Sequence, residues 1–150
     1  AEYFLNGQLS KSIRRSETNA AGDTTTTELV KEYFQGAPQK ALEQIRDSKD
    51  RLLQETRFTY DSVKSGFRKE RTRVLTYNED GLAGTETISY LNSRGQVSRV
   101  AENRFLYQKD GKTPGNWIRK VITPENSIIA RRIAYFEEKP VQAADSIPGN

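Results

Sequence analysis

The chain contains no cysteine, no histidine and no methionine in its 150 residues. Without cysteine it has neither disulfides nor thiolate chemistry. Without histidine it cannot form a Ser–His–Asp or Cys–His nucleophile arrangement, and a conventional zinc site loses its usual ligands. A Gly-rich phosphate loop with its Lys and Ser/Thr is also missing. We therefore expect no enzyme, no metal site and no cofactor.

Large apolar side chains are scarce. Val, Ile, Leu and Phe make up 32 of the 150 residues, and the mean hydropathy is −0.82. This content is near the level at which chains stay disordered, so any core must be thin and extended strand pairing must hold the fold together. No apolar run approaches the ~20 residues of a spanning helix, so we expect no transmembrane segment.

The sequence has no methionine and begins at Ala1, so we expect Ala1 to be either a processed or a trimmed N-terminus. Signal peptidases leave small residues at the cut. This favours a processed, secreted chain that is periplasmic, outer-membrane-anchored or extracellular. The net charge of +4 is a mild excess spread along the chain. Solvated strand faces commonly have this composition, and no nucleic-acid partner is expected.

A short phrase recurs along the chain. "FLNGQLSKSI" at residues 4–13 is nearly "YLNSRGQVSRV" at residues 90–100, with two residues fewer in the turn. Each unit has an aromatic residue, a few polar residues and then glycine. The aromatic–glycine pairs are Phe4 and Gly7, Phe34 and Gly36, Tyr77 and Gly81, Tyr90 and Gly95, and Tyr107 and Gly111. Such units are typical of β-hairpins, and chained hairpins make an antiparallel meander.

The predicted fold is all-β: one domain over residues 1–150, an antiparallel meander of hairpin repeats in an open or curved sheet with a thin core. Alternate residues in 54–60 and 128–136 fall on two faces with the period of two typical of strands, and neither face is wholly apolar. The small, polar residues 16–28 are predicted to be a linker, and residues 139–150 a flexible tail.

Residues 27–55 allow two interpretations. Thr25 and Glu28 could form a helix capping box, and Leu42 and Ile45 have helical spacing. The "QGAP" stretch at residues 35–38 breaks a single long helix, which favours strands. A helix packed on the sheet is the alternative.

Three stretches resemble bacterial envelope proteins. "RDSKDRLLQETRFTYDS" at residues 46–62 resembles the YD repeat of Rhs-like surface proteins, although Asp50 replaces the family's glycine. "EYFLNGQLSKSI" resembles a MORN-variant repeat, and residues 115–136 are similar to a phrase of secreted bacterial repeat proteins. The resemblance implies a β-meander and an envelope or secreted setting, and supplies no catalytic motif.

A stripe of rings and guanidinium groups is the candidate ligand site. Rings stack on sugars, and arginine binds carboxylates in a fork. The stripe consists of Arg73, Tyr77, Arg99, Tyr107, Trp117 and Arg119. The simpler interpretation is that the rings cover the thin core beneath arginine stems.

These features favour a non-catalytic interaction or structural module that binds a glycan, an envelope polymer or a partner protein. The alternative is an immunity or antitoxin-type protein-binding module, or a fragment of a larger repeat shell. An enzyme that uses carboxylates such as Asp61, Glu86, Glu102 or Asp110 is the least favoured class. The ligand and the oligomeric state do not follow from the sequence.

Overall fold

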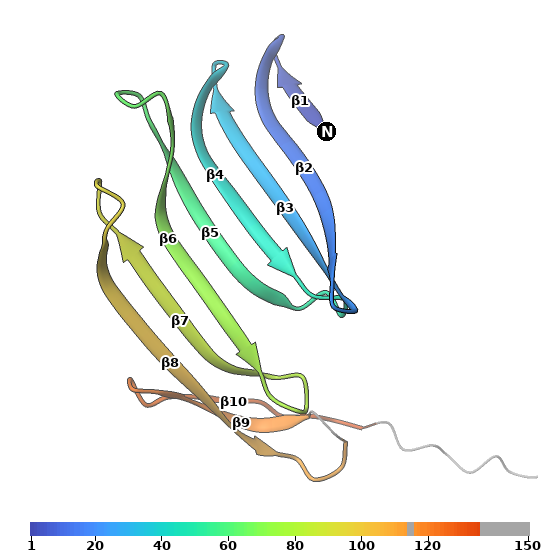
Figure 1. Cartoon of the computed structure of the whole chain (residues 1–150). Helices are drawn as coiled ribbons and strands as arrows, with labels where there is room; N and C mark the ends of the chain where they lie inside the picture. The colour runs from blue at the N-terminus through green and yellow to red at the C-terminus, as the bar shows by residue number, and fades with distance from the viewer. Residues whose placement is uncertain (114–115, 136–150) are drawn as a thin grey trace, which may run out of the picture.

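The computed structural model describes residues 1–113 and 116–135. They form ten antiparallel strands in a single sheet, in chain order (Figure 1), so the predicted all-β meander is confirmed. The strands are β1 (Glu2–Leu5), β2 (Gln8–Ala20), β3 (Asp23–Phe34), β4 (Ala37–Arg46), β5 (Leu52–Asp61), β6 (Gly66–Tyr77), β7 (Ala83–Leu91), β8 (Val97–Lys109), β9 (Trp117–Thr123) and β10 (Ser127–Ala130).

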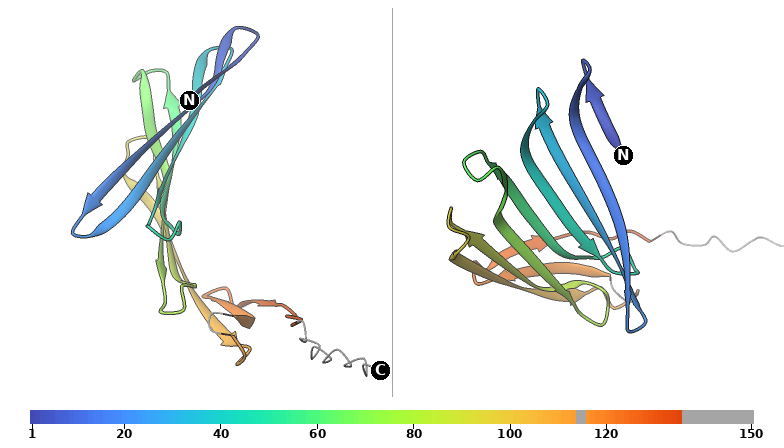
Figure 2. Two further views of the ribbon diagram at one scale, coloured as in Figure 1. Left: turned by 90° about the vertical axis from the view of Figure 1, so that its right-hand side faces the viewer. Right: turned by 45° about the horizontal axis from the view of Figure 1, so that its top comes forward.

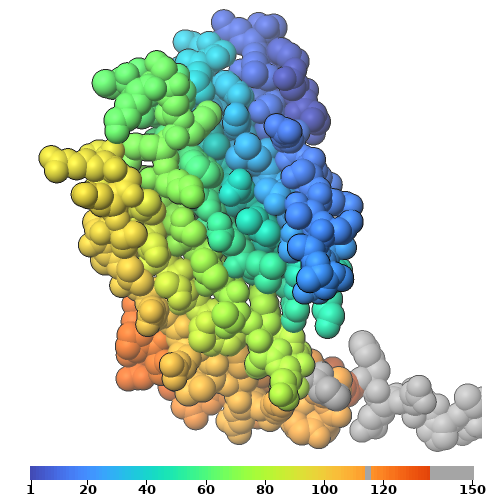
Figure 3. All heavy atoms as spheres, in the orientation of Figure 1, coloured from blue at the N-terminus to red at the C-terminus, as the bar shows by residue number. Residues whose placement is uncertain are grey.

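The sheet is one layer thick and strongly twisted. Figure 3 shows the hairpins side by side in chain order, and Figure 2 shows β9 and β10 turned away from the plane of β2 and β3. Seven of the nine strand pairs contain a register shift, which increases local twist. Within the described residues β1 and β10 each have one neighbouring strand, so the sheet is open.

Tight turns connect the first four strands. Asn6–Gly7, Ala21–Gly22 and Gln35–Gly36 all have positive φ at both residues. Two-residue turns of this kind match the twist of the flanking strands, and glycine adopts the second position without strain.

The five turns between β4 and β9 share a capping residue. The side-chain oxygen of an Asp or Asn at the end of a strand or directly after it accepts hydrogen bonds from backbone N–H groups two to four residues later. These caps are Asp47, Asp61, Asn78, Asn92 and Asp110. After Tyr77, Tyr90 and Tyr107 the recurring phrase is therefore a strand end followed by an Asx turn, whereas after Phe4 and Phe34 it is a two-residue turn.

The core is as thin as its composition predicts. Among the described residues, Ala41 and Leu75 are the buried hydrophobic side chains, and Thr56, Glu55 and Glu86 are buried with them. Most strand residues are half-buried. Cross-strand contacts on both faces therefore replace a central core.

The predicted linker over residues 16–28 is wrong. This segment forms the paired ends of β2 and β3 around the Ala21–Gly22 turn, with Ser16 opposite Thr27. Its polar composition suits a strand here because both faces are open to water. Thr24 to Thr27 are β-branched and favour extended backbone.

The alternative of a helix within residues 27–55 is also wrong, because these residues belong to β3, β4 and β5. Gln35–Gly36 makes the turn between β3 and β4, and Pro38 lies at a register shift, where a missing N–H is tolerated. No helix in the described part of the chain is long and apolar enough to cross a membrane. The predicted tail over residues 139–150 lies outside the described residues.

Candidate functional site

Five aromatic rings of β6 to β9 lie on one side of the sheet, and cross-strand pairing defines that side. Directly paired residues point to the same side. Leu75 pairs with Glu86 and Glu86 with Asn103, while Tyr107 pairs with Lys120. We call this side the ring face; it carries Tyr77, Tyr90, Phe105, Tyr107 and Trp117.

Five of the six predicted ligand residues share the ring face, and Arg119 does not. The pairing of β8 with β9 shifts between Gln108 and Lys109, so Trp117 lies opposite Lys109. The Trp117 ring packs against Tyr107 at 5.9 Å between centroids. Arg119 instead pairs with Gln108 and Ala130, on the other face. Strict alternation of side chains along β9 predicted that Trp117 and Arg119 share a face, because it took no account of this bulge.

Arg73 is part of an internal ion pair. Its guanidinium donates to the Glu86 carboxylate, which also accepts a hydrogen bond of 2.9 Å from the Asn103 amide. Glu86 is 8% exposed. Arg73 therefore neutralises a buried carboxylate and is a poor candidate for an external ligand.

Tyr77 and Tyr107 each bond to the preceding, adjacent strand beyond the last residue pair of the two strands. Each phenol donates a 2.7 Å hydrogen bond to a backbone carbonyl, Tyr77 to Leu52 and Tyr107 to Ala83. Burial raises the pKa of Tyr107 above its ordinary value. Both phenols act in the fold, and their ring faces are what remains for a ligand.

Three cation–ring pairs lie along β8 on the ring face. The Arg99 guanidinium is 4.4 Å from the Tyr90 centroid, the Lys120 ammonium 4.2 Å from Phe105, and the Arg131 guanidinium 4.1 Å from Trp117. Arg99 and Tyr107 mark the two ends of the row, about 26 Å apart at ~3.3 Å per residue. The row contains Arg99, Tyr107 and Trp117 from the six predicted ligand residues. It also contains Tyr90, Phe105, Lys120 and Arg131, which were not among those six.

Comparison of the chain with protein-family models, with curated proteins and with solved structures gave no match. The resemblance to YD and MORN-variant repeats therefore stays a prediction. Any functional assignment depends on the geometry of the ring face.

A polar network crosses the middle of the ring face. The Glu55 carboxylate accepts hydrogen bonds from Gln44 at 3.0 Å and Arg71 at 3.1 Å. Arg57 lies 3.6 Å away. Burial alone would raise the pKa of Glu55, but the Gln44 bond, the Arg57 charge and Arg71 outweigh it and the net pKa is lowered. Glu86 behaves in the same way. Burial raises its pKa, but the hydrogen bonds from Asn103 and Arg73 outweigh burial, so the net pKa is lowered.

These two lowered pKa values predict acid sensitivity. A carboxylate whose folded-state pKa lies below its unfolded value stabilises the fold above the unfolded pKa, here the ordinary value of 4.5 for Glu55 and Glu86. That stabilisation is lost as the pH falls from there through the folded-state pKa. Urea denaturation at pH 7, 5, 4 and 3 should show a falling free energy of unfolding, with a smaller fall in Glu86→Gln. Equal stability at pH 5 and pH 3 would contradict the role of these pairs.

The other candidate carboxylates have different surroundings. Asp61 and Asp110 cap turns, as described above. Glu102 is exposed on the opposite face, where it lines an open polar hollow with Thr87 and Arg104. Among residues 1–113 and 116–135, no three acidic side chains gather as a metal site would require.

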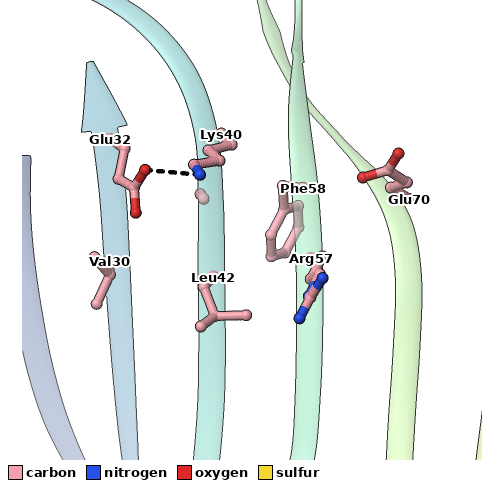
Figure 4. A pocket seen from close by; sticks show the side chains of 8 residues that line it. Val30, Glu32, Lys40, Leu42, Arg57, Phe58 and Glu70 are labelled. Atoms are coloured by element: carbon pink, nitrogen blue, oxygen red, sulfur yellow. Dashed lines mark ion pairs between the residues drawn. The ribbon is translucent and has the colours of Figure 1, made fainter. Parts of the chain in front are cut away.

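A second hollow lies on β3 to β6 (Figure 4), with a volume of about 320 Å³. Its apolar lining consists of Val30, Ala41, Leu42 and Phe58. Charged side chains surround them, and the dashed line in Figure 4 marks the 3.0 Å pair between Lys40 and Glu32. Because Lys40 and Arg57 both have carboxylate partners within the sheet, this hollow is a weaker candidate than the row along β8.

Proposed function

We propose that this chain is a non-catalytic binding module of a secreted, periplasmic or outer-membrane-anchored protein. Its ligand is an extended acidic polymer, such as an acidic glycan, lying along β8 on the ring face. The row of three cation–ring pairs carries the proposal. Aromatic rings provide surfaces on which sugars stack, and the cations provide partners for carboxylates.

The charges of the row are available to a ligand. In the described part of the chain, Arg99, Lys120 and Arg131 form no ion pair with a carboxylate; the pairs that occur involve other cations. Arg99 and Arg131 are also exposed. A guanidinium stacked on a ring has lost side-chain freedom already, so binding costs less entropy.

The spacing of the row favours a polymer over a small ligand. A row of about 26 Å on an open strand surface has no enclosing walls, whereas small-molecule sites are concave and bury most of the ligand. A polymer compensates through several weak contacts along its length.

Binding should depend on the cations of the row and not on total charge. Titration with polygalacturonate, a linear acidic glycan, can be followed by the fluorescence of Trp117, the single tryptophan. We expect Arg99→Ala/Arg131→Ala to weaken binding about 30-fold, at about 1 kcal/mol for each cation. Affinity of the wild type should fall as salt rises.

The matched control is Arg104→Ala/Arg119→Ala, which removes the same charge from the opposite face of β8 and β9. It should retain wild-type affinity within about threefold. Neutral dextran should not bind. Equal losses in the two double variants would show a nonspecific charge effect, and absence of binding across several acidic glycans would overturn the proposal in favour of a protein partner.

A further inference from the structure

The two outer strands of the sheet each present an unpaired edge within the described residues. β1 pairs with β2 alone and β10 with β9 alone. Rows of free N–H and C=O groups at a sheet edge are templates for another strand. Proteins commonly protect such edges with lysine or proline, and neither occurs within β1 or β10.

Backbone hydrogen bonds show which residues face outward. Ala1 and Ile13 exchange two bonds of 2.7 Å, so the alternate residues Glu2 and Phe4 turn their N–H and C=O away from β2. Arg131 donates to the Ile118 carbonyl. By the same alternation, Ile128 and Ala130 turn their backbone groups away from β9.

The side chains at both edges are apolar and exposed. Tyr3, Phe4 and Leu5 are at least half exposed, and the neighbouring turn adds Phe34. On β10, Ile128 and Ile129 are 56% and 45% exposed. The chain is 29% charged, yet β10 has no charged residue and β1 has only Glu2. Exposed apolar patches of this kind mark interaction surfaces.

We infer that β10 of one copy pairs with β1 of a second copy, joining copies head to tail into a continuous sheet. Odd and even strands of a meander run in opposite directions, so β10 beside a second β1 continues the antiparallel order. Both strands have four residues. Such a heterologous contact repeats along an open chain or closes into a ring.

Full overlap of the two strands fixes the register. Glu2 lies opposite Ala130, Tyr3 opposite Ile129, Phe4 opposite Ile128, and Leu5 opposite Ser127. Both Tyr3 and Ile129 belong to the ring face, through their pairs Lys11 and Lys120. The faces of successive copies therefore coincide, and each aromatic ring meets a β-branched side chain, a favourable cross-strand pair.

Disulfide trapping tests this register. Tyr3 and Ile129 direct their backbone groups to their own sheets, so across the junction they form a non-hydrogen-bonded pair with close Cβ atoms. Because the chain has no cysteine, Tyr3→Cys/Ile129→Cys introduces the only two thiols. Mild oxidation should give a ladder of reducible multimers. The control Tyr3→Cys/Val63→Cys, whose Val63 is exposed in the β5–β6 turn, should give much less. Equal ladders in both would overturn the inference.

Complementation of two blocked edges tests the head-to-tail order. Phe4→Lys blocks β1 and Ile128→Lys blocks β10, and both positions are exposed, so folding should persist by circular dichroism. In light scattering, the wild type should gain mass as concentration rises. Each variant alone should remain at 17.1 kDa, and an equal mixture should form dimers that grow no further.

The remaining outcomes contradict the inference. Association of either variant with itself would indicate pairing between two β1 edges or two β10 edges. A wild type that stays at 17.1 kDa at millimolar concentration would show that neither edge takes up a second copy. None of these readouts involves the proposed glycan, so they are independent of the ligand experiment.

Discussion

Replacing Glu86 with alanine is expected to lower the free energy of unfolding by about 3 kcal/mol. Glu86 is 8% exposed and accepts hydrogen bonds from Arg73 and Asn103. Alanine would leave both donors without their acceptor, and the Arg73 charge without its counterion. The Arg73 side chain is 32% exposed, so water can solvate its charge once Glu86 is gone. The expected loss of unfolding free energy is therefore at the lower end of the range for a broken buried ion pair.

Two further variants separate the pairing from the loss of atoms. Glu86→Gln retains an acceptor oxygen and should cost about 1 kcal/mol at pH 7. Glu102→Ala, next to Asn103 in β8 but on the opposite face, removes an exposed carboxylate and should change stability by less than about 0.5 kcal/mol. Equilibrium urea denaturation measures all three. A Glu86→Ala protein as stable as Glu102→Ala would show that the Arg73–Glu86 pair contributes nothing.

Replacing Leu75 with alanine is expected to cost about 2–3 kcal/mol. Leu75 is the largest hydrophobic side chain among the buried described residues, at 9% exposed, and it pairs with Glu86 on the ring face. Its loss removes apolar contacts and admits water beside the Arg73–Glu86 pair. In a protein with so few buried apolar side chains, neighbouring residues can compensate little.

The matched control for this prediction is Leu106→Ala. Leu106 lies in β8 and is 56% exposed, so its truncation should change the free energy of unfolding by less than about 0.5 kcal/mol. The melting temperature and the urea midpoint should move in the same order. If Leu75→Ala and Leu106→Ala had equal free energies of unfolding, burial of Leu75 between β6 and β7 would contribute nothing to stability.

The polar network explains how a chain with few large apolar residues maintains a wide sheet. Gln44, Arg71 and Arg57 surround Glu55, while Arg73 and Asn103 surround Glu86. Together these groups link β4 to β8 across the ring face. Satisfied networks rigidify a structure, whereas half-satisfied ones destabilise it. The same arrangement that holds the sheet therefore makes it sensitive to acid.

Much of the fold was predictable because hairpin signals are local. Asn6–Gly7 and Gly36 specify tight turns within two residues, and Asp61 or Asn92 caps its own turn within four. Strands containing Phe58, Tyr77 and Tyr90 follow from these turns and are confirmed. Ile133 was also predicted to lie in a strand, but β10 ends at Ala130.

Errors arose where composition was taken as a substitute for pairing. Residues 16–28 are polar enough for a linker, yet they form the turn-side half of the β2–β3 pairing, which has no register shift. A strand in a single-layer sheet does not need an apolar face, because a neighbouring strand supplies the backbone hydrogen bonds. The polar sequence was therefore compatible with both outcomes.

The sequence by itself determined the all-β class, the positions of most turns and the thinness of the core, because turn chemistry and strand period act over a few residues. Only the tertiary structure decided which side chains meet. The register shift between β8 and β9 placed Trp117 and Arg119 on opposite faces, and pairing of β6 with β7 brought Arg73 to Glu86. A bulge reverses the face of every residue beyond it, and its position depends on two strands at once.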